Sequence, residues 1–234
     1  MSIVISLYDY TGVAVIPWAE AGHDCYCYDI QHNENTQVKT FNSGGSISYV
    51  KADLYNVEVN VLLHEEHLNE GVVFAMAFPV CTDLAVSGAA WFKAKAERDP
   101  EFQLKAVQNA VRCSQMFKSW DVPFYIENPI SVLSTQWRKP DYMFHPYEYG
   151  GYIKAGKEPH PLYPDYIAAS DAYSKKTCLW TNSKFKMPVK KPVECESYGK
   201  STQHSKLGGK SLKTKNIRSA TPRGFAEAVY QANK

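Results

Sequence analysis

The stretch that decides the fold is Gly71-Val72-Val73-Phe74-Ala75-Met76-Ala77-Phe78, which runs directly into Pro79-Val80-Cys81-Thr82. A wholly apolar run of this length, bounded by proline, is typical of a buried central strand rather than an amphipathic helix. The cysteine then lies at the carboxyl tip of the strand, where open α/β sheets place their chemistry. Cys81 is therefore a candidate nucleophile, although most free cysteines are buried and inert.

A second apolar run, Val122–Ile126, ends in Glu127-Asn128-Pro129. A strand here would put Glu127 and Asn128 at its tip, so that a thiol and a carboxyl group on two strand tips could act as nucleophile and proton donor. The plainer interpretation is that Glu127 only forms hydrogen bonds with a loop.

Segments typical of strands and helices alternate through the first 130 residues, which favours an α/β fold with a doubly wound, mostly parallel sheet. The strands that we expect are Ile3–Tyr8, Cys25–Ile30, Ile47–Ala52, Gly71–Phe78, Val122–Ile126, Tyr142–Pro146 and Lys176–Thr181. The helices that we expect are Pro17–Ala21, Val59–Leu68, a helix from Asp99-Pro100-Glu101 to about Trp120, and Arg223–Gln231. Leu104, Val107, Val111 and Phe117 mark the expected core face of the third helix.

With 234 residues and a net charge of +2, the chain is long enough for one well-packed domain and is nearly neutral. No stretch approaches the roughly 20 apolar residues of a membrane span, and the N-terminus resembles a strand more than a signal peptide. The six cysteines lack a framework spacing, which fits reduced thiols in a cytosol. We therefore expect a cytoplasmic protein without a membrane anchor.

The basic residues are concentrated in one segment, and this divides the chain into a catalytic and cofactor-binding domain (1–181), a basic segment (182–218) and a C-terminal helix (219–234). The excess of lysine in 182–218 favours contact with phosphates, although such lysines are often only solvated. The lysines that we expect to bind nucleic acid are Lys184, Lys186, Lys190, Lys191, Lys206, Lys210, Lys213 and Lys215.

The N-terminal third contains a candidate cofactor half-site. Asp9-Tyr10-Thr11-Gly12 follows the first expected strand, Asp29 ends the second, and Asp53 follows the third. A glycine in such a turn lets the backbone approach a ligand, and a carboxylate on the second strand tip accepts hydrogen bonds from a ribose diol. Without a ligand, Asp29 would simply be a solvated strand end.

In this order, the motifs resemble those of the cytosine-5 DNA methyltransferase superfamily, and the chain is most similar to its compact, phage-type members. Pro79-Val80-Cys81 is similar to the nucleophile motif of the family, and Glu127-Asn128-Pro129 to its Glu-Asn-Val motif. The further matching segments are Leu7–Gly12 with Asp29-Ile30 for the cofactor, Lys175–Trp180 for a basic motif that steadies the target ring, and Arg218–Phe225 before the last helix.

The resemblance implies a Rossmann-like class I S-adenosylmethionine-dependent methyltransferase with a small basic, loop-rich C-terminal insertion, acting on DNA in a bacterial host cell if it is phage-encoded. A thiolate would add to carbon 6 of cytosine, an acid would protonate ring nitrogen 3, and a lysine would stabilise the exocyclic oxygen. The residues implied for catalysis are Cys81, Glu127, Asn128, Lys175 and Lys176. Those implied for S-adenosylmethionine are Tyr8, Asp9, Thr11, Gly12, Asp29, Ile30, Asp53, Leu54 and Pro79.

The chain departs from the family pattern in three places. Val80 stands where the family usually has proline or a direct link, and Lys175 and Lys176 stand where arginines are usual. Only about 40 residues occupy the place where sequence-specific members of the family carry a large recognition domain. Two alternatives therefore stay open: a methyltransferase for a free pyrimidine nucleotide or RNA, and a non-catalytic DNA- or protein-binding module on the same fold.

Overall fold

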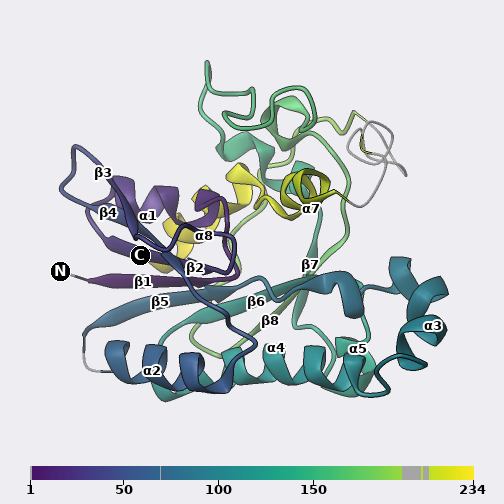
Figure 1. The fold of residues 1–234 in the computed structure, drawn as a ribbon. Coiled ribbons are helices and arrows are strands. Elements are labelled where there is room, and N and C mark those ends of the chain that lie inside the picture. Colours follow the sequence, from purple (N-terminus) through teal and green to yellow (C-terminus); the bar gives the residue numbers. More distant parts are fainter. Residues whose placement is uncertain (1, 69, 197–206, 208–210) are drawn as a thin grey trace.

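The computed structural model describes residues 2–68, 70–196, 207 and 211–234, and these form one eight-stranded mixed sheet of order β3-β4-β2-β1-β5-β6-β8-β7 (Figure 1). The strands are β1 (Ile3–Leu7), β2 (Asp24–Asp29), β3 (Gln37–Thr40), β4 (Ser46–Lys51), β5 (Val72–Ala77), β6 (Phe124–Pro129), β7 (Tyr142–Phe144) and β8 (Thr177–Thr181).

The central strands β4, β2, β1, β5 and β6 are parallel, whereas β3 and β8 run antiparallel to their neighbours. The chain passes from β1 outward to β2 and β4, and then returns to β5 on the other side of β1. The strand order therefore reverses between β1 and β5, and ligands of such sheets bind outside the carboxyl ends of the strands at this point.

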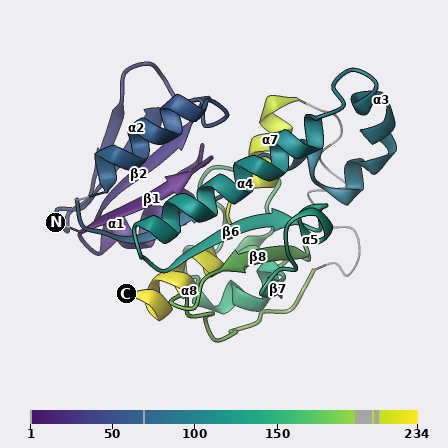
Figure 2. The same ribbon diagram turned by 90° about the horizontal axis from the view of Figure 1, so that it is seen from below.

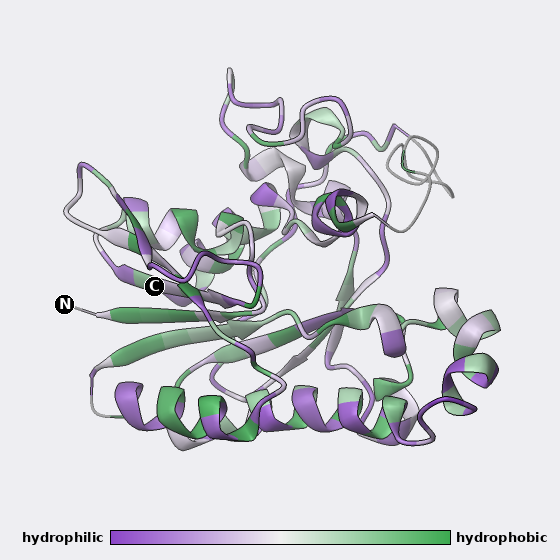
Figure 3. Cartoon of the chain, viewed as in Figure 1, coloured by the Kyte–Doolittle hydropathy of each residue, from purple (hydrophilic) through white to green (hydrophobic). Residues whose placement is uncertain are grey.

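Helices cover both faces of the sheet. The upper face in Figure 1 carries α1 (Ile16–Glu20) and α8 (Arg223–Asn233), and the lower face, nearest the viewer in Figure 2, carries α2 (Val57–His67) and α4 (Phe102–Ser119). Trp18 and Phe225 pack on Phe74 and its neighbours above the sheet, while Phe117 packs with Ile5 below it. Because both faces are covered, β5 is apolar along its whole length and β1 contains one polar residue, the buried Ser6 (Figure 3).

The smaller elements connect this framework. The further α-helices are α3 (Phe92–Ala96), α5 (Leu133–Gln136) and α7 (Leu212–Ser219). The 3-10 segments are η1 (Val13–Val15), η2 (Cys81–Asp83), η3 (Val86–Trp91), η4 (Pro146–Tyr152) and η5 (Ala169–Asp171).

The predicted α/β class with a mostly parallel sheet is confirmed, and the arrangement is compatible with a Rossmann-like fold. All seven predicted strands are present, but β3 was not predicted. All four residues of β3 are exposed, so this strand carries no burial pattern that a sequence could reveal.

The start and the core face of α4 differ from the prediction. The helix begins at Phe102, because the Asp99 side chain accepts a hydrogen bond from the Glu101 amide (3.1 Å) and turns the chain before the helix. Leu104 is 50% exposed, so its predicted place in the core is wrong. At about 100° per residue it lies almost opposite the stripe of Ala106, Ala110 and Phe117, which is buried.

The basic segment contains a helix that was not predicted. Ser211 caps α7, since its side chain accepts a hydrogen bond from the Thr214 amide (3.2 Å). This helix crosses the predicted boundary between 218 and 219. Lys206 and Lys210, both expected to bind nucleic acid, lie outside the described residues.

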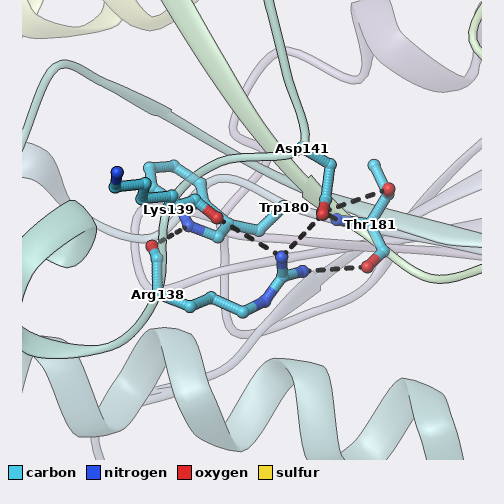
Figure 4. A network of polar contacts seen from close by, with 5 residues as sticks. All are labelled: Arg138, Lys139, Asp141, Trp180 and Thr181. Atoms are coloured by element: carbon cyan, nitrogen blue, oxygen red, sulfur yellow. Dashed lines mark hydrogen bonds and ion pairs between the residues drawn. The ribbon is translucent and has the colours of Figure 1, made fainter.

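A polar network fixes the antiparallel pair of β7 and β8 at the amino edge of the parallel strands (Figure 4). The Asp141 carboxylate accepts hydrogen bonds from Arg138 (2.8 Å) and from the Thr181 amide (2.7 Å). Arg138 also donates to the Thr181 carbonyl oxygen (2.9 Å), and Trp180 donates to the Arg138 carbonyl oxygen (2.7 Å). These bonds hold the loop before β7 against the end of β8, far from the strand tips that carry Cys81 and Glu127.

Candidate functional site

Cys81 lies in a tight turn just beyond β5. The Phe78 amide donates to the Leu7 carbonyl oxygen (3.0 Å), which extends the pairing of β5 with β1 up to this turn. The amides of Leu84 and Ala85 then donate to the Cys81 carbonyl oxygen (3.0 and 2.8 Å). Cys81 is exposed, whereas the other five cysteines are buried. Cys81, at the strand tip, is therefore the cysteine that lies at the surface.

The charges around Cys81 act on its pKa in opposite directions. Although the residue as a whole is exposed, neighbouring atoms shield the thiol from bulk water, and this desolvation raises its pKa. The Lys175 and Lys215 ammonium groups lower that pKa, and the Glu127 carboxylate raises it. The sulfur is therefore a protonated thiol in the resting protein, and an added positive charge would favour the thiolate.

Glu127 lies near the end of β6, half-buried and poorly solvated. Its Oε1 atom is buried without a hydrogen-bond partner among the described residues. Burial raises the pKa of this carboxyl group, and the Lys175 ammonium opposes the rise. A carboxyl group in this environment tends to hold its proton, and an acid must hold a proton if it is to protonate a ring.

Asn128 joins the tips of the two central strands. Its buried side-chain amide donates a hydrogen bond to the Pro79 carbonyl oxygen (2.8 Å), two residues before Cys81. Its Oδ1 atom is buried without a partner in the described part of the chain. Asn128 therefore positions the Cys81 turn relative to Glu127, and the buried Pro79 is part of this link.

The structure separates the two candidate lysines. Lys175 comes just before β8, donates to the Arg218 carbonyl oxygen (2.9 Å), and lowers the pKa of both Cys81 and Glu127. Lys176 is exposed and acts instead on the buried Cys178 thiol. Lys175 is thus the lysine that lies with the thiol and the acid.

A small pocket opens beside Glu127 and Lys175. Its walls are aromatic, and Thr177 and Thr221 add hydroxyl groups. The aromatic residues are Phe78, Tyr125, Phe144 and Phe225, and the segment Ser219–Pro222 closes one side. The volume of the pocket is about 10 Å³, room for about one water molecule, so a flat heterocycle would need these walls to move apart.

The Asp9 side chain organises the loop after β1 from inside. Its carboxylate accepts hydrogen bonds from the Ser6 hydroxyl (2.8 Å), the Gly12 amide (2.8 Å) and the Thr11 hydroxyl (3.3 Å). Burial nonetheless raises the pKa of Asp9. Asp9 and Thr11 therefore shape the predicted cofactor loop rather than offering free ligand groups.

Gly12 is required where the loop turns into η1. Its φ is +65°, and a Cβ atom there would lie 2.7 Å from the Tyr49 hydroxyl oxygen. Any larger residue would push the Tyr49 ring away from the loop. We predicted that a ligand would approach the backbone at Gly12; in the described structure the Tyr49 side chain makes this close approach.

Tyr8 also has a left-handed backbone, with φ 60°, which is uncommon outside glycine and concentrates at functional sites. Its hydroxyl donates to the carbonyl oxygen of the buried Leu54 (3.1 Å). This bond links the tip of β1 to the loop after β4, and so shapes the edge where a cofactor is expected.

Two carboxylates at this edge keep an oxygen for a ligand. Asp29 is buried and its Oδ1 accepts the Gln31 amide (2.8 Å), while the exposed Asp53 accepts the Tyr55 amide through Oδ1 (3.0 Å). The described residues give neither Oδ2 atom a hydrogen bond. Asp29 ends β2, and Asp53 follows β4, the parallel neighbour of β2. Ile30, next to Asp29, is 56% exposed. These two hydrogen-bond acceptors fit a ribose diol, and Ile30 adds an apolar contact.

Within the described ranges, the basic residues predicted to bind nucleic acid do not form one surface. Lys184 pairs with Asp121 (2.7 Å) before β6, at the edge opposite Cys81. Lys190 pairs with Glu148 (2.6 Å), and Lys191 and Lys213 lie over the rings of Tyr152 and Tyr166. Lys186 is exposed near the end of α8, where its amide donates to Asn233 (2.8 Å).

Lys215 is the member of this set that α7 brings toward Cys81. The same helix places Asn216 against Gln31 beyond β2 (3.0 Å) and the Arg218 carbonyl oxygen against Lys175. The position of Lys215 near Cys81 was missed, because the segment was interpreted as loop. The capping Ser211 was the available signal.

Comparison with models of known protein families and with curated proteins finds no match to this chain. Among the described residues, no group of three or more His, Cys, Asp or Glu side chains could hold a metal ion. No helix within that same part of the chain is long and apolar enough to cross a bilayer.

Proposed function

We propose that the protein transfers a methyl group from S-adenosylmethionine to position 5 of cytosine in DNA. One observation carries the proposal: Lys175 acts electrostatically on both the Cys81 thiol and the Glu127 carboxyl group. These two groups come from the tips of the neighbouring strands β5 and β6. A nucleophile, an acid and a cation at the carboxyl edge of one sheet are the groups that this chemistry needs.

The cofactor would be held where the strand order reverses. The loop Tyr8–Gly12 would enclose it, and the free oxygens of Asp29 and Asp53 would accept hydrogen bonds from its ribose and adenine. S-adenosylmethionine supplies an electrophilic methyl group when it is bound. The residues named here fit such a ligand, since their backbone turns are preformed by Asp9 and Tyr8.

The first covalent step belongs to Cys81 and Glu127. The thiolate forms a bond to carbon 6 of cytosine, and the electron pair of the double bond between carbons 5 and 6 moves into the ring. Glu127 gives its proton to ring nitrogen 3, while Lys175 stabilises negative charge at the exocyclic oxygen. Carbon 5 thereby becomes nucleophilic enough to accept a methyl group.

The last step releases the protein. Carbon 5 then carries both a methyl group and a hydrogen, and a base removes that hydrogen as a proton. The electron pair left behind restores the double bond between carbons 5 and 6 and expels Cys81 as a thiolate, and nitrogen 3 returns its proton to Glu127. A cytosine in duplex DNA must leave the base stack for this chemistry.

A free pyrimidine nucleotide or RNA is the second candidate substrate. The division of the predicted basic residues between opposite edges of the sheet favours it, because no single described surface gathers them for a long duplex. Glu127 and Lys175, which line the small pocket, would act on the ring of either substrate.

The test measures transfer of labelled methyl groups to duplex DNA, single-stranded DNA, RNA and deoxycytidine monophosphate. Label in one of these and none with Cys81→Ser supports the proposal, and Cys113→Ser, which removes a buried thiol in α4, is the matched control. An acceptor with fluorine at position 5 should trap the Cys81 adduct, because fluorine cannot leave as a cation. No label in any acceptor, or full activity of Cys81→Ser, refutes it.

A further inference from the structure

A second, larger groove lies away from the Cys81 edge, between α1, the residues after β3, the segment 152–161 and the start of α8. Its volume is about 430 Å³, within the range of about 300–1,000 Å³ that is usual for small-ligand sites. It shares no lining residue with the pocket beside Glu127. The helix α8 separates the two, since Phe225 faces the first pocket while Arg223 and Ala226 face the groove.

The groove combines apolar walls with lysines. Its apolar surface comes from Ile16, Phe41, Ile153, Pro159 and Pro161. Lys39, Lys154 and Lys157 line the same space and are exposed. None of the ion pairs formed within the described ranges involves any of these three lysines. The Lys39 ammonium lies over the Phe41 ring (5.0 Å), so Lys154 and Lys157 offer the charges that are available to a ligand.

The groove is preformed on the side of α8. The Arg223 guanidinium donates hydrogen bonds to the carbonyl oxygens of Lys157 (2.7 Å) and Glu158 (2.6 Å) and so fixes this wall. Of the two lining carboxylates, Glu227 accepts a hydrogen bond from Gln231 (2.7 Å), and Glu20 lies at the end of α1. The balance of charge in the groove favours an anion.

We propose that this groove binds a nucleotide unit, with its phosphate on Lys154 and Lys157 and its base against the apolar walls. Phosphate contacts by lysine combined with base contacts to apolar and aromatic side chains are the general mode of sequence-tolerant nucleotide binding. The unit is either a free nucleotide or one residue of a nucleic-acid strand. The site is independent of methyl transfer, since none of its residues lines the pocket beside Glu127 and none is Cys81.

The experiment compares the wild-type chain with the double variant Lys154→Glu/Lys157→Glu and with Lys118→Glu, which alters an exposed lysine on α4 across the sheet. The probes are deoxycytidine monophosphate, by calorimetry, and a labelled single-stranded thymidine oligonucleotide, by fluorescence anisotropy. We expect the double variant to raise the Kd of the oligonucleotide at least about tenfold and to lower the salt slope of binding by about 2, with no change for Lys118→Glu.

Weakening of both probes assigns the groove to free nucleotides as well as strands, and weakening of the oligonucleotide alone assigns it to strands. The proposal is overturned if neither probe binds, or if Lys118→Glu weakens binding as much as the double variant. If the Tm of Lys154→Glu/Lys157→Glu is lower than that of the wild type, the milder double variant Lys154→Gln/Lys157→Gln replaces it. Oligonucleotide binding that persists in Cys81→Ser shows that the groove does not depend on the Cys81 thiol. A failure of methyl transfer alone then leaves this proposal standing.

Discussion

The Asn128 side-chain amide donates a hydrogen bond to the Pro79 carbonyl oxygen over 2.8 Å, across 49 positions of sequence. This bond joins the tip of β6, which carries Glu127, to the turn that carries Cys81. The acid and the thiol come from separate strands, so their relative position depends on such links between strand tips. Asn128 was predicted as a catalytic residue, and in the structure its side-chain amide holds the turn that carries Cys81.

We expect Asn128→Asp to reduce both stability and activity. The substitution keeps the shape of the side chain but puts carboxylate oxygens against the Pro79 carbonyl oxygen, where the donor has been lost. An unsatisfied buried group costs about 1–3 kcal/mol in the free energy of unfolding. Urea unfolding and kcat/KM for methyl transfer measure the two effects, and Asn109→Asp, on the buried face of α4, is a control for the same chemical change elsewhere. Unchanged kcat/KM would remove Asn128 from the site.

The proposed mechanism predicts an unusual dependence on pH, because it needs a Cys81 thiolate together with a protonated Glu127. Desolvation raises the pKa of both groups, and the thiol has the higher ordinary value. The active combination is therefore a minor one. In the wild-type chain, kcat/KM should rise up to the pKa of Glu127, stay level, and fall above the pKa of Cys81.

Glu127→Gln tests this assignment. The amide does not titrate, so kcat/KM should continue to rise about tenfold per pH unit through the level region until the Cys81 pKa is reached. The absolute rate should be about 10² to 10⁴ lower, because an amide cannot give a proton to the ring. A profile that keeps the wild-type plateau would show that Glu127 is not the acid.

Lys175 and Lys176 should differ in their effect on the Cys81 thiol. The Lys175 ammonium lowers the pKa of Cys81, so Lys175→Ala should raise that pKa further and slow alkylation by iodoacetamide at a given pH. Lys176→Ala removes a neighbouring exposed charge and should leave the alkylation rate unchanged. Mass spectrometry of the Cys81 peptide gives the rate, whether or not the protein is a methyltransferase. Equal slowing by both variants would contradict the geometry.

The sequence was sufficient to predict the edge where these groups meet. The apolar runs of β5 and β6 are continuous because helices cover both faces, and parallel strands bring their carboxyl tips to one edge. Cys81, Glu127 and a lysine before β8 could therefore be placed together from the order of their motifs alone.

The remaining features depend on contacts that no local pattern encodes. Lys175 and Lys176 are adjacent in the sequence. They differ in a hydrogen bond that the Lys175 ammonium donates to the Arg218 carbonyl oxygen in α7. Asp9 looked like a ligand because it follows a strand, yet Ser6 and Gly12 occupy its oxygens. The carboxylate that caps α8 lies 53 positions before Gly224, too far along the chain for a local pattern to reveal.

That cap is Asp171, and it predicts a pH-dependent stability. Its buried Oδ2 accepts a hydrogen bond from the Gly224 amide (2.9 Å) in the first turn of α8, while Oδ1 is buried without a partner in the described chain. Burial raises the pKa of Asp171 to about 6, and the hydrogen bond from Gly224 and the charge of Arg223 limit the rise. The group binds its proton more tightly in the folded protein than in the unfolded chain.

The stabilisation from that proton is therefore fully present below the unfolded pKa and is lost as the pH rises through about 6. In Asp171→Asn the side-chain oxygen can still accept the Gly224 hydrogen bond, but the group no longer titrates. Between about pH 4 and about pH 8, the variant should gain about 2–3 kcal/mol in the free energy of unfolding relative to the wild type. Urea unfolding of both proteins at the two pH values measures the difference, and Asp165→Asn, in the neighbouring segment, is the control. A difference that does not change with pH would show that folding leaves the pKa of Asp171 unchanged.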